Sequence, residues 1–325
     1  MTLLGQDRAV SAFREAMDSG SLHHAWLLAG PRGVGKGTFA RAAARRVLAE
    51  AGGPPVRLPG LETPDDHRMV RLIDAGSHPD FRLVKREAHD SGPKKGELRR
   101  GISIDQIRKL QELFAVAPSL GDWRVAIIDC MDELESQAAQ ALLKSLEEPP
   151  AKSLFLLVSH APGRLLPTIR SRCRRLDFQT LDSAALDTIL AEQLPRLSAE
   201  ERQRLIPLAA GSAGRALDFA ELDLGPLAQE ALTILRHGDP DNARRSRLAS
   251  TLALKAAAPR YAAFLDMVPS LLAGEARTAE GARRLRAAEA YEQARETASL
   301  APRLSLDPAS TVFALATLMA GVGQA

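Results

Sequence analysis

Cysteine is nearly absent from this chain of 325 residues, which contains only Cys130 and Cys173. Two thiols are too few for a disulfide framework or a four-cysteine zinc site, so we expect a reducing compartment, the cytoplasm. No apolar run reaches the roughly 18 residues that a membrane-spanning helix needs. The first residues also lack the basic region and apolar run of a secretion signal. We therefore expect neither a secreted protein nor one embedded in a membrane.

An excess of charge of one sign is also lacking. The 43 Lys and Arg residues nearly balance the 40 Asp and Glu residues, and the net charge is only +3. Electrostatics of the whole molecule therefore gives little support to nucleic-acid binding, and any such contact must be local. Only 8 of the basic residues are lysines, so an isolated arginine carries little information. Hydrophobic residues at 45% and charged residues at 26% are typical of globular domains.

Three short apolar runs, at 25–29, 125–128 and 154–158, alternate with helical patterns in the first half. Such runs predict a parallel sheet covered by helices on both faces. We expect this α/β domain over 1–178, with an exposed insertion at about 52–100 that contains one strand at 81–84. Ser103 and Gln106 are spaced as a capping box that begins a helix. After Phe178 the pattern is helical, and we expect a small helical domain over 179–224 and another over 225–325.

Residues 30–36 match the pattern of a phosphate-binding loop between a strand and a helix. Gly30, Gly33 and Gly35 allow backbone N–H groups to close around phosphate oxygens, and Lys36 adds positive charge. The helix that follows adds the partial positive charge of its N-terminus. These residues predict a nucleotide-binding site.

The position after Lys36, where Ser or Thr normally holds a magnesium ion, is Gly37. Thr38 comes one residue late, which turns a helical side chain by about 100°. We therefore predict a degenerate site, in which nucleotide binding can survive while productive positioning of magnesium is impaired.

The second element of such a site is an acidic residue at the end of a buried strand, and Asp129 fits this description. In active ATPases of this kind an adjacent Glu polarises the attacking water, but here Cys130 takes its place. A thiol with a pKa of about 8.5 is a poor general base for water, and we expect Cys130 to be a small buried residue. Asp132 and Glu133 are the alternative bases, although both lie past the end of the strand.

Three segments carry a resemblance to a known family. Residues 127–134, residues 141–150 and residues 165–173, which end in Ser171-Arg172-Cys173, resemble clamp-loader subunits of the AAA+ superfamily. Gly5-Gln6 near the start agrees, and the resemblance covers about the first 180 residues. The late Thr, the missing Glu and the retained Ser-Arg-Cys are more similar to the delta-prime type of subunit of bacterial DNA polymerase III clamp loaders than to the ATP-hydrolysing gamma/tau type.

This resemblance implies an AAA+ α/β module, a helical lid and a helical collar through which five subunits form a ring. It implies that Arg172 is an arginine finger acting in trans, since a guanidinium can neutralise charge on phosphate bound by a neighbour. Ser159 and Arg215 match the first and second sensor positions. The implied partners are gamma/tau and delta subunits, with the sliding clamp and primed DNA contacted indirectly. No catalysis by the chain itself and no required cofactor are expected, although ATP or ADP can still bind.

Bacterial relatives often carry a four-cysteine zinc module soon after the phosphate loop, but residues 52–100 contain no cysteine. His67, His78 and His89 are too far apart for a local cluster of metal ligands, and we expect them at the surface. No zinc or other metal is therefore predicted. Cys173 has basic neighbours that could lower its pKa, but without a Cys-x-x-Cys partner we expect no redox role.

Two other functions stay open at this point. The chain could be an active ATPase motor of the same family, with Asp132 or Glu133 in place of the missing Glu. It could also be a DNA-binding module with a vestigial nucleotide fold, although its net charge of +3 argues against this.

Overall fold

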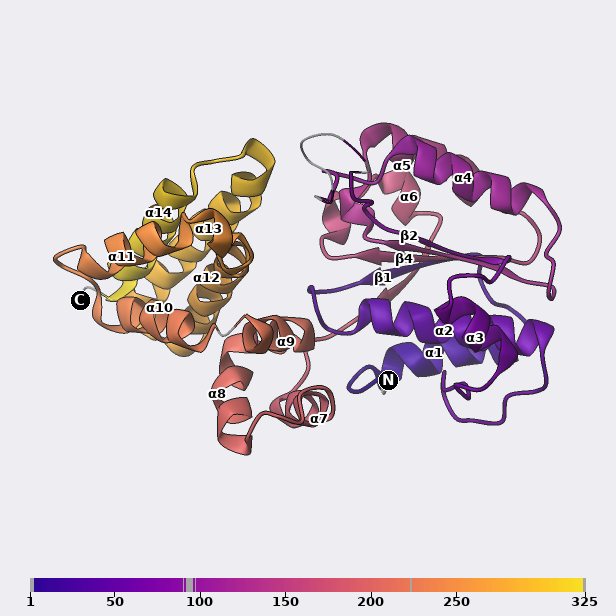
Figure 1. The fold of residues 1–325 in the computed structure, drawn as a ribbon, viewed down its shortest axis with the longest axis horizontal. Helices are drawn as coiled ribbons and strands as arrows, with labels where there is room; N and C mark the ends of the chain where they lie inside the picture. The colour runs from indigo at the N-terminus through magenta and orange to yellow at the C-terminus, as the bar shows by residue number, and fades with distance from the viewer. Residues whose placement is uncertain (1–2, 90, 92–95, 97, 223, 324–325) are drawn as a thin grey trace. The chain divides into compact units, whose positions relative to one another are not determined.

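The computed structural model describes residues 3–89, 91, 96, 98–222 and 224–323 (Figure 1). The chain divides into two compact units, Met1–Thr180 and Leu181–Ala325. The first is an α/β unit and the second is helical. The predicted fold class, an α/β module with a parallel sheet followed by helical structure, is thereby confirmed. The further division of the second half at residue 224 into lid and collar stays a prediction.

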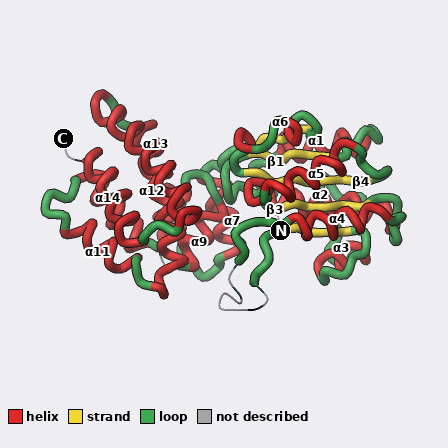
Figure 2. Tube along the Cα trace, turned by 90° about the horizontal axis from the view of Figure 1, so that it is seen from above, coloured by secondary structure: helices red, strands yellow, loops and turns green. Residues whose placement is uncertain are grey.

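A five-stranded parallel sheet forms the centre of the first unit, with strand order β2-β3-β4-β1-β5. Helices α1, α2 and α3 cover one face and α4, α5 and α6 cover the other (Figure 1). Figure 2 shows the strands side by side, with α4 and α5 over them. Strands β1, β3 and β4 are buried almost throughout, as their apolar runs predict. The strands are β1 (Ala25–Ala29), β2 (Phe81–Val84), β3 (Arg124–Asp129), β4 (Ser153–Ser159) and β5 (Arg174–Asp177).

The helices of the first unit follow the strands in the alternation that the sequence predicts. The capping box at the start of α4 is present, because Ser103 N donates to Gln106 Oε1 at 3.1 Å. Two short 3-10 turns, η1 (Met131–Glu133) and η2 (Pro162–Arg164), follow β3 and β4. The helices are α1 (Asp7–Asp18), α2 (Lys36–Gly52), α3 (Arg68–Asp74), α4 (Ile104–Ala115), α5 (Ser136–Glu147) and α6 (Pro167–Arg170).

The segment 52–100 is more ordered than its composition predicts. Its strand at 81–84 is confirmed, but α3 was not foreseen. His67 caps α3, since its Nδ1 accepts from Met69 N at 3.3 Å, and His78 Nδ1 accepts from Asp80 N at 3.1 Å. The expectation that these histidines lie at the surface is wrong, because His67 and His78 are only 7% and 5% exposed. His89 is half-buried. In each ring Nδ1 is satisfied by a backbone N–H, whereas Nε2 is buried without a hydrogen-bond partner among the described residues.

Arg46 on α2 anchors the start of this segment. Its guanidinium is 2% exposed and donates to the backbone oxygens of Val56, Leu58 and Glu62, at 3.0, 2.9 and 2.6 Å. It also forms an ion pair with Glu50 at 2.6 Å. One buried side chain therefore satisfies the backbone of a loop that has no sheet or helix of its own.

The second unit is built from helices around one apolar core, in which Phe264, Met267, Val312 and Leu315 are fully buried. Helix α14 begins after Asp307, whose carboxylate accepts from Ser310 N at 2.8 Å. No helix in the described part of the chain is both long enough and apolar enough to cross a membrane. The helices are α7 (Ser183–Gln193), α8 (Ala199–Ala209), α9 (Ala213–Glu221), α10 (Gly225–His237), α11 (Ala243–Leu252), α12 (Ala258–Thr278), α13 (Gly281–Leu304) and α14 (Pro308–Gly323), with the 3-10 turn η3 (Lys255–Ala257) before α12.

Candidate functional site

The loop between β1 and α2 has the backbone conformation that its glycines predict. Gly33 and Gly35 have φ angles of +75° and +99°, a region that side chains rarely tolerate. Gly35 precedes the first residue of α2. A Cβ atom on Gly30 would lie 2.4 Å from the backbone oxygen of Phe178. Glycine is therefore required at all three positions, and the loop presents the N-terminus of a long helix, as a phosphate-binding loop does.

Gln6 connects this loop to the end of the sheet. Its side chain is 4% exposed, and Nε2 donates to the backbone oxygens of Val34 at 3.1 Å and Gln179 at 2.8 Å. Gln179 N donates back to Gln6 Oε1 at 3.3 Å. The sequence associates Gln6 with the family only by position, and its role as a buried link between distant segments was missed.

Lys36 is buried in the loop. Its Nζ donates to Gly30 O at 2.6 Å and also to Pro31 O. Burial lowers its pKa to about 8, against the opposing effect of the acidic groups nearby, including Asp129 and Asp132. The structure thus brings together the predicted lysine and the predicted acidic residue at the end of β3.

Gly37 faces Asp129. A Cβ atom at position 37 would lie 3.4 Å from Asp129 Oδ2, so a Ser or Thr there would place its hydroxyl beside this carboxylate. The half-buried Thr38 is the next residue on α2, turned by about 100° around the helix axis. The side of the site that would position a magnesium ion therefore has the carboxylate and lacks the hydroxyl at position 37.

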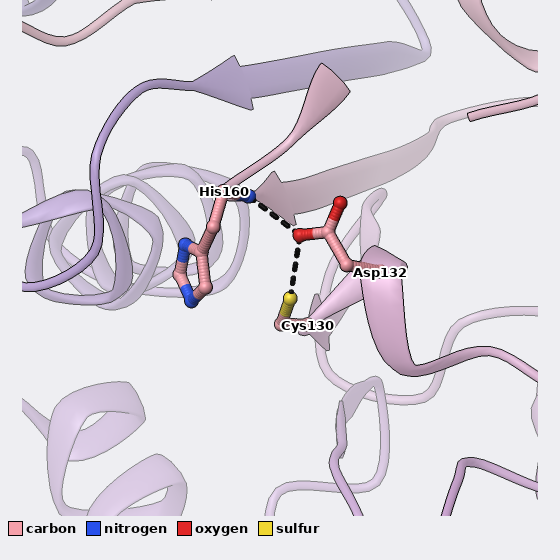
Figure 3. Close-up of side chains that lie close together, drawn as sticks. All are labelled: Cys130, Asp132 and His160. Carbon is pink, nitrogen blue, oxygen red and sulfur yellow. Dashed lines mark hydrogen bonds between the residues drawn. The ribbon is translucent and has the colours of Figure 1, made fainter. Parts of the chain in front are cut away.

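Asp132 links the ends of β3 and β4 (Figure 3). Its Oδ1 accepts from Ser159 Oγ at 2.9 Å and from Ala161 N at 3.2 Å. Its Oδ2 accepts from His160 N at 2.5 Å and from Cys130 Sγ at 2.9 Å. Burial alone would raise the pKa of Asp132, but these four hydrogen bonds bring it below its ordinary value. The predicted sensor residue Ser159, which is fully buried, therefore contacts Asp132.

The two alternative bases are both engaged elsewhere. Asp132 uses both carboxylate oxygens for the contacts just described. Glu133 Oε2 lies 2.9 Å from Arg86 Nε in an ion pair. Burial nevertheless raises the pKa of Glu133. Neither carboxylate is arranged as an unpaired acceptor for a water proton.

Both cysteines are poor nucleophiles and poor bases in this structure. Cys130 is 5% exposed, as expected for a small buried residue. Burial, together with the contact to Asp132, raises the pKa of its thiol far above the usual range. Burial also raises the pKa of Cys173 to about 12, so its basic neighbours do not lower it. That Cys173 has no redox role stays a prediction.

His160, which directly follows β4, also lies beside this site. Burial, together with the positive charges of Lys36 and Arg32, lowers its pKa to about 4 against the opposing effect of Asp132. The imidazole is therefore neutral at physiological pH. No sequence motif points to this residue.

Arg172 lies in the first unit, just after α6. Its Nη1 donates to Thr168 O at 2.9 Å, and its Nη2 lies 2.8 Å from Glu147 Oε1 at the end of α5. The Arg172 side chain is 35% exposed. The predicted arginine finger is thus held by its own unit while part of its guanidinium faces solvent.

Arg215 belongs to the second unit, in the first turn of α9. Its backbone N donates to Ser212 Oγ, which caps the helix, at 3.1 Å. Its Nη1 donates to Ala209 O at 3.5 Å. Its assignment as a second sensor stays a prediction.

A family model described as DNA polymerase III, delta subunit, matches residues 5–182. The chain belongs to this family. A DNA polymerase III subunit delta' of Pseudomonas aeruginosa is 35% identical over 189 residues, which are 58% of this chain and 53% of the relative. A subunit tau of Salmonella typhimurium is 29% identical over 230 residues, 71% of this chain and 32% of the relative. The resemblance to delta-prime clamp-loader subunits is confirmed.

The matched part of this DNA polymerase III delta-family chain contains the phosphate loop, the ends of β3 and β4, and Arg172. The chain spans about half the length of the delta' relative. A solved structure of a gamma subunit-related protein from Thermotoga maritima aligns with 97% of this chain and 100% of that chain at 16% identity, with a TM-score of 0.44.

Proposed function

We propose that this chain is a stator subunit of a DNA polymerase III clamp loader, without ATP hydrolysis of its own. In this role it offers Arg172 to ATP bound by a neighbouring subunit while the complex opens a sliding clamp and places it on primed DNA. The proposal is carried by one contrast. Cys130, buried and protonated, occupies the place of the catalytic Glu, while Arg172 keeps a partly exposed guanidinium.

The chain's own nucleotide site supports the first half of this proposal. The backbone of residues 30–35 and the buried Lys36 suit a phosphate group. A bound ATP or ADP would place its phosphates in this loop. Gly37 provides no hydroxyl beside Asp129, and Asp132 and Glu133 are held by other groups. We therefore expect weak nucleotide binding, no productive hydrolysis and no required cofactor.

The position of Arg172 supports the second half. A guanidinium is always charged and planar, so it can neutralise two oxygens of a γ-phosphate as charge develops there. The hydrogen bond from Nη1 to Thr168 O restricts its side chain without burying it. A side chain held in this way loses less conformational entropy when it meets a neighbour's phosphate.

The partners in this proposal are gamma/tau and delta subunits, in a ring of five held through the helices after residue 224. Clamp and primed DNA are contacted through the assembled complex. The proposed compartment is the cytoplasm, where chromosomal replication takes place in bacteria.

Reconstitution tests the proposal. Arg172→Ala is assembled with partner subunits, and DNA-stimulated ATP hydrolysis is measured beside complex formation by size exclusion. We expect hydrolysis to fall several-fold with assembly intact. Arg175→Ala is the matched control, since Arg175 is a nearby exposed arginine paired with Asp177, and it should leave the rate unchanged. An unchanged rate for Arg172→Ala in an intact complex would remove the finger role.

The isolated chain separates this function from the two alternatives. A motor subunit would hydrolyse ATP alone and lose this activity in Lys36→Ala. A DNA-binding module would bind DNA tightly, with an affinity that falls steeply with salt. We expect neither behaviour.

A further inference from the structure

Cys130, Asp132 and His160 bring three different metal-ligating groups together (Figure 3). Cys130 and Asp132 follow β3, and His160 follows β4. One ligand atom from each residue lies within 4.8 Å of the other two. Within the described part of the chain, no other three His, Cys, Asp or Glu side chains converge in this way. Each residue lies within three positions of the end of a strand, so the sheet restricts where the three backbones can be.

The spacing is suited to a small tetrahedral ion. Zinc binds sulfur at about 2.3 Å and nitrogen or oxygen at about 2.0 Å, which puts neighbouring ligands about 3.5 Å apart. Cys130 Sγ and Asp132 Oδ2 are 2.9 Å apart. They must therefore separate by about half an ångström while the imidazole of His160 moves toward them. Side-chain rotations of this size need no change of the strands.

The contact between Cys130 and Asp132 already contains a replaceable proton. The thiol donates its hydrogen to Asp132 Oδ2. When a divalent ion binds, the S–H bond breaks, its proton passes to water, and sulfur and Oδ2 both bond to the ion. The other three hydrogen bonds of Asp132, from Ser159, His160 and Ala161, can remain. They orient the carboxylate in the way that outer-shell contacts orient metal ligands.

Access and charge are compatible with an ion at this place. Cys130 is buried, but Asp132 and His160 are exposed, so an ion and one water molecule can enter from solvent. A thiolate, a carboxylate and a divalent cation sum to zero charge, compared with −1 for the thiol and carboxylate alone. Binding of the ion therefore changes the net charge of this group of ligands from −1 to 0. Lys36 nearby loses an attraction but meets no net positive charge. Its Nζ is bonded to the oxygens of Gly30 and Pro31 instead.

We propose that Cys130, Asp132 and His160 bind one thiophilic divalent cation of the zinc class, with water as its fourth ligand. Sulfur and imidazole donors select against magnesium and calcium, which prefer oxygen. The site differs from a four-cysteine module in its ligands and in its place beside the phosphate loop. It does not depend on the stator role proposed above.

Cobalt(II) is the probe that tests this site. The reduced, chelator-treated full chain is titrated with Co²⁺, and we expect a thiolate-to-cobalt charge-transfer band that saturates at one equivalent and disappears when Zn²⁺ is added. Cys130→Ser should abolish the band, and Cys173→Ser should keep it. His160→Ala, a change at an exposed residue that the fold should tolerate, should weaken binding at least about tenfold.

Three results would overturn the proposal. These are the absence of a charge-transfer band in the parent chain, a band that follows Cys173 rather than Cys130, and unchanged cobalt affinity in His160→Ala. Circular dichroism of each variant establishes that it is folded. If Cys130→Ser fails to fold, the comparison of Cys173→Ser with His160→Ala still decides between the outcomes.

Discussion

Glu147 Oε1 lies 2.8 Å from Arg172 Nη2, so the proposed arginine finger is paired within its own chain. The two side chains are 46% and 35% exposed, respectively. An ion pair with this exposure contributes at most about 1 kcal/mol. The pair is therefore strong enough to hold the guanidinium near α5 and weak enough for a phosphate group to displace the carboxylate.

The first prediction follows from this competition. Glu147→Gln removes the carboxylate charge and keeps the size of the side chain, so a neighbour's phosphate no longer has to displace it. We expect DNA-stimulated hydrolysis by the reconstituted complex to rise by up to about fivefold, the equivalent of 1 kcal/mol. Glu148→Gln, at the next and exposed position, is the control. A rate that drops in Glu147→Gln would show that the ion pair orients the finger productively.

The second prediction concerns position 37. Gly37→Thr would place a hydroxyl beside Asp129 and restore the missing magnesium contact. We expect the magnesium-dependent part of ATP affinity to increase roughly tenfold, as one charge-assisted hydrogen bond can provide. Gly37→Ala adds the Cβ atom without the hydroxyl and should leave this part unchanged. Titration with labelled ATP, with and without magnesium, measures both, and equal gains in the two variants would contradict the prediction.

The third prediction is a pH dependence of stability. Burial lowers the pKa of Lys36 to about 8 from its ordinary value of 10.5. Between these two pH values the unfolded chain binds more protons at this site than the folded chain does. The contribution of Lys36 to the free energy of unfolding should therefore rise by about 3 kcal/mol from pH 8 to pH 10.5.

Urea unfolding across this pH range measures the effect. Lys36→Met should lose the rise, whereas Lys144→Met, at an exposed position on α5, should keep it. Parallel curves for the parent chain and Lys36→Met would refute the predicted shift.

The fourth prediction concerns Arg46. Arg46→Met keeps much of the side-chain volume but leaves the backbone oxygens of Val56, Leu58 and Glu62 without their donor. We expect unfolding to cost about 3 kcal/mol less. Arg41→Met, at an exposed position on the same helix, should change stability by less than about 0.5 kcal/mol. Thermal unfolding compares the two, and equal melting temperatures would contradict an anchoring role.

Where the pattern is regular, the sequence was sufficient to predict the structure. The apolar runs at β1, β3 and β4 can only be buried in the middle of a covered parallel sheet, and these strands were predicted. Strand β5 was missed because it is a charged edge strand, in which Leu176 is the only buried residue. Helix α3 was missed because Gly and Pro residues surround its short apolar stretch. Its burial depends on contact with α2, which local patterns do not contain.

The residues of the candidate site also fall into two groups, those whose position the sequence could predict and those whose contacts it could not. The loop glycines, Lys36, Asp129 and Ser159 could be predicted because they lie at strand or helix ends, where position in the chain fixes position in space. Three of the four contacts of Asp132 could not, since they join segments 27 to 29 residues apart through side-chain hydrogen bonds. The burial of His67 and His78 was misjudged because composition alone does not reveal a backbone N–H that needs an acceptor.

Gln6 connects the phosphate loop to a segment that lies far from it in the sequence. The Gln6 side chain forms hydrogen bonds with Val34 on the loop and with Gln179 after β5. A displacement of the loop is therefore passed to the segment that ends the first unit at Thr180. In the stator role proposed above, a nucleotide bound in this loop would therefore act on the segment that follows β5 without being hydrolysed.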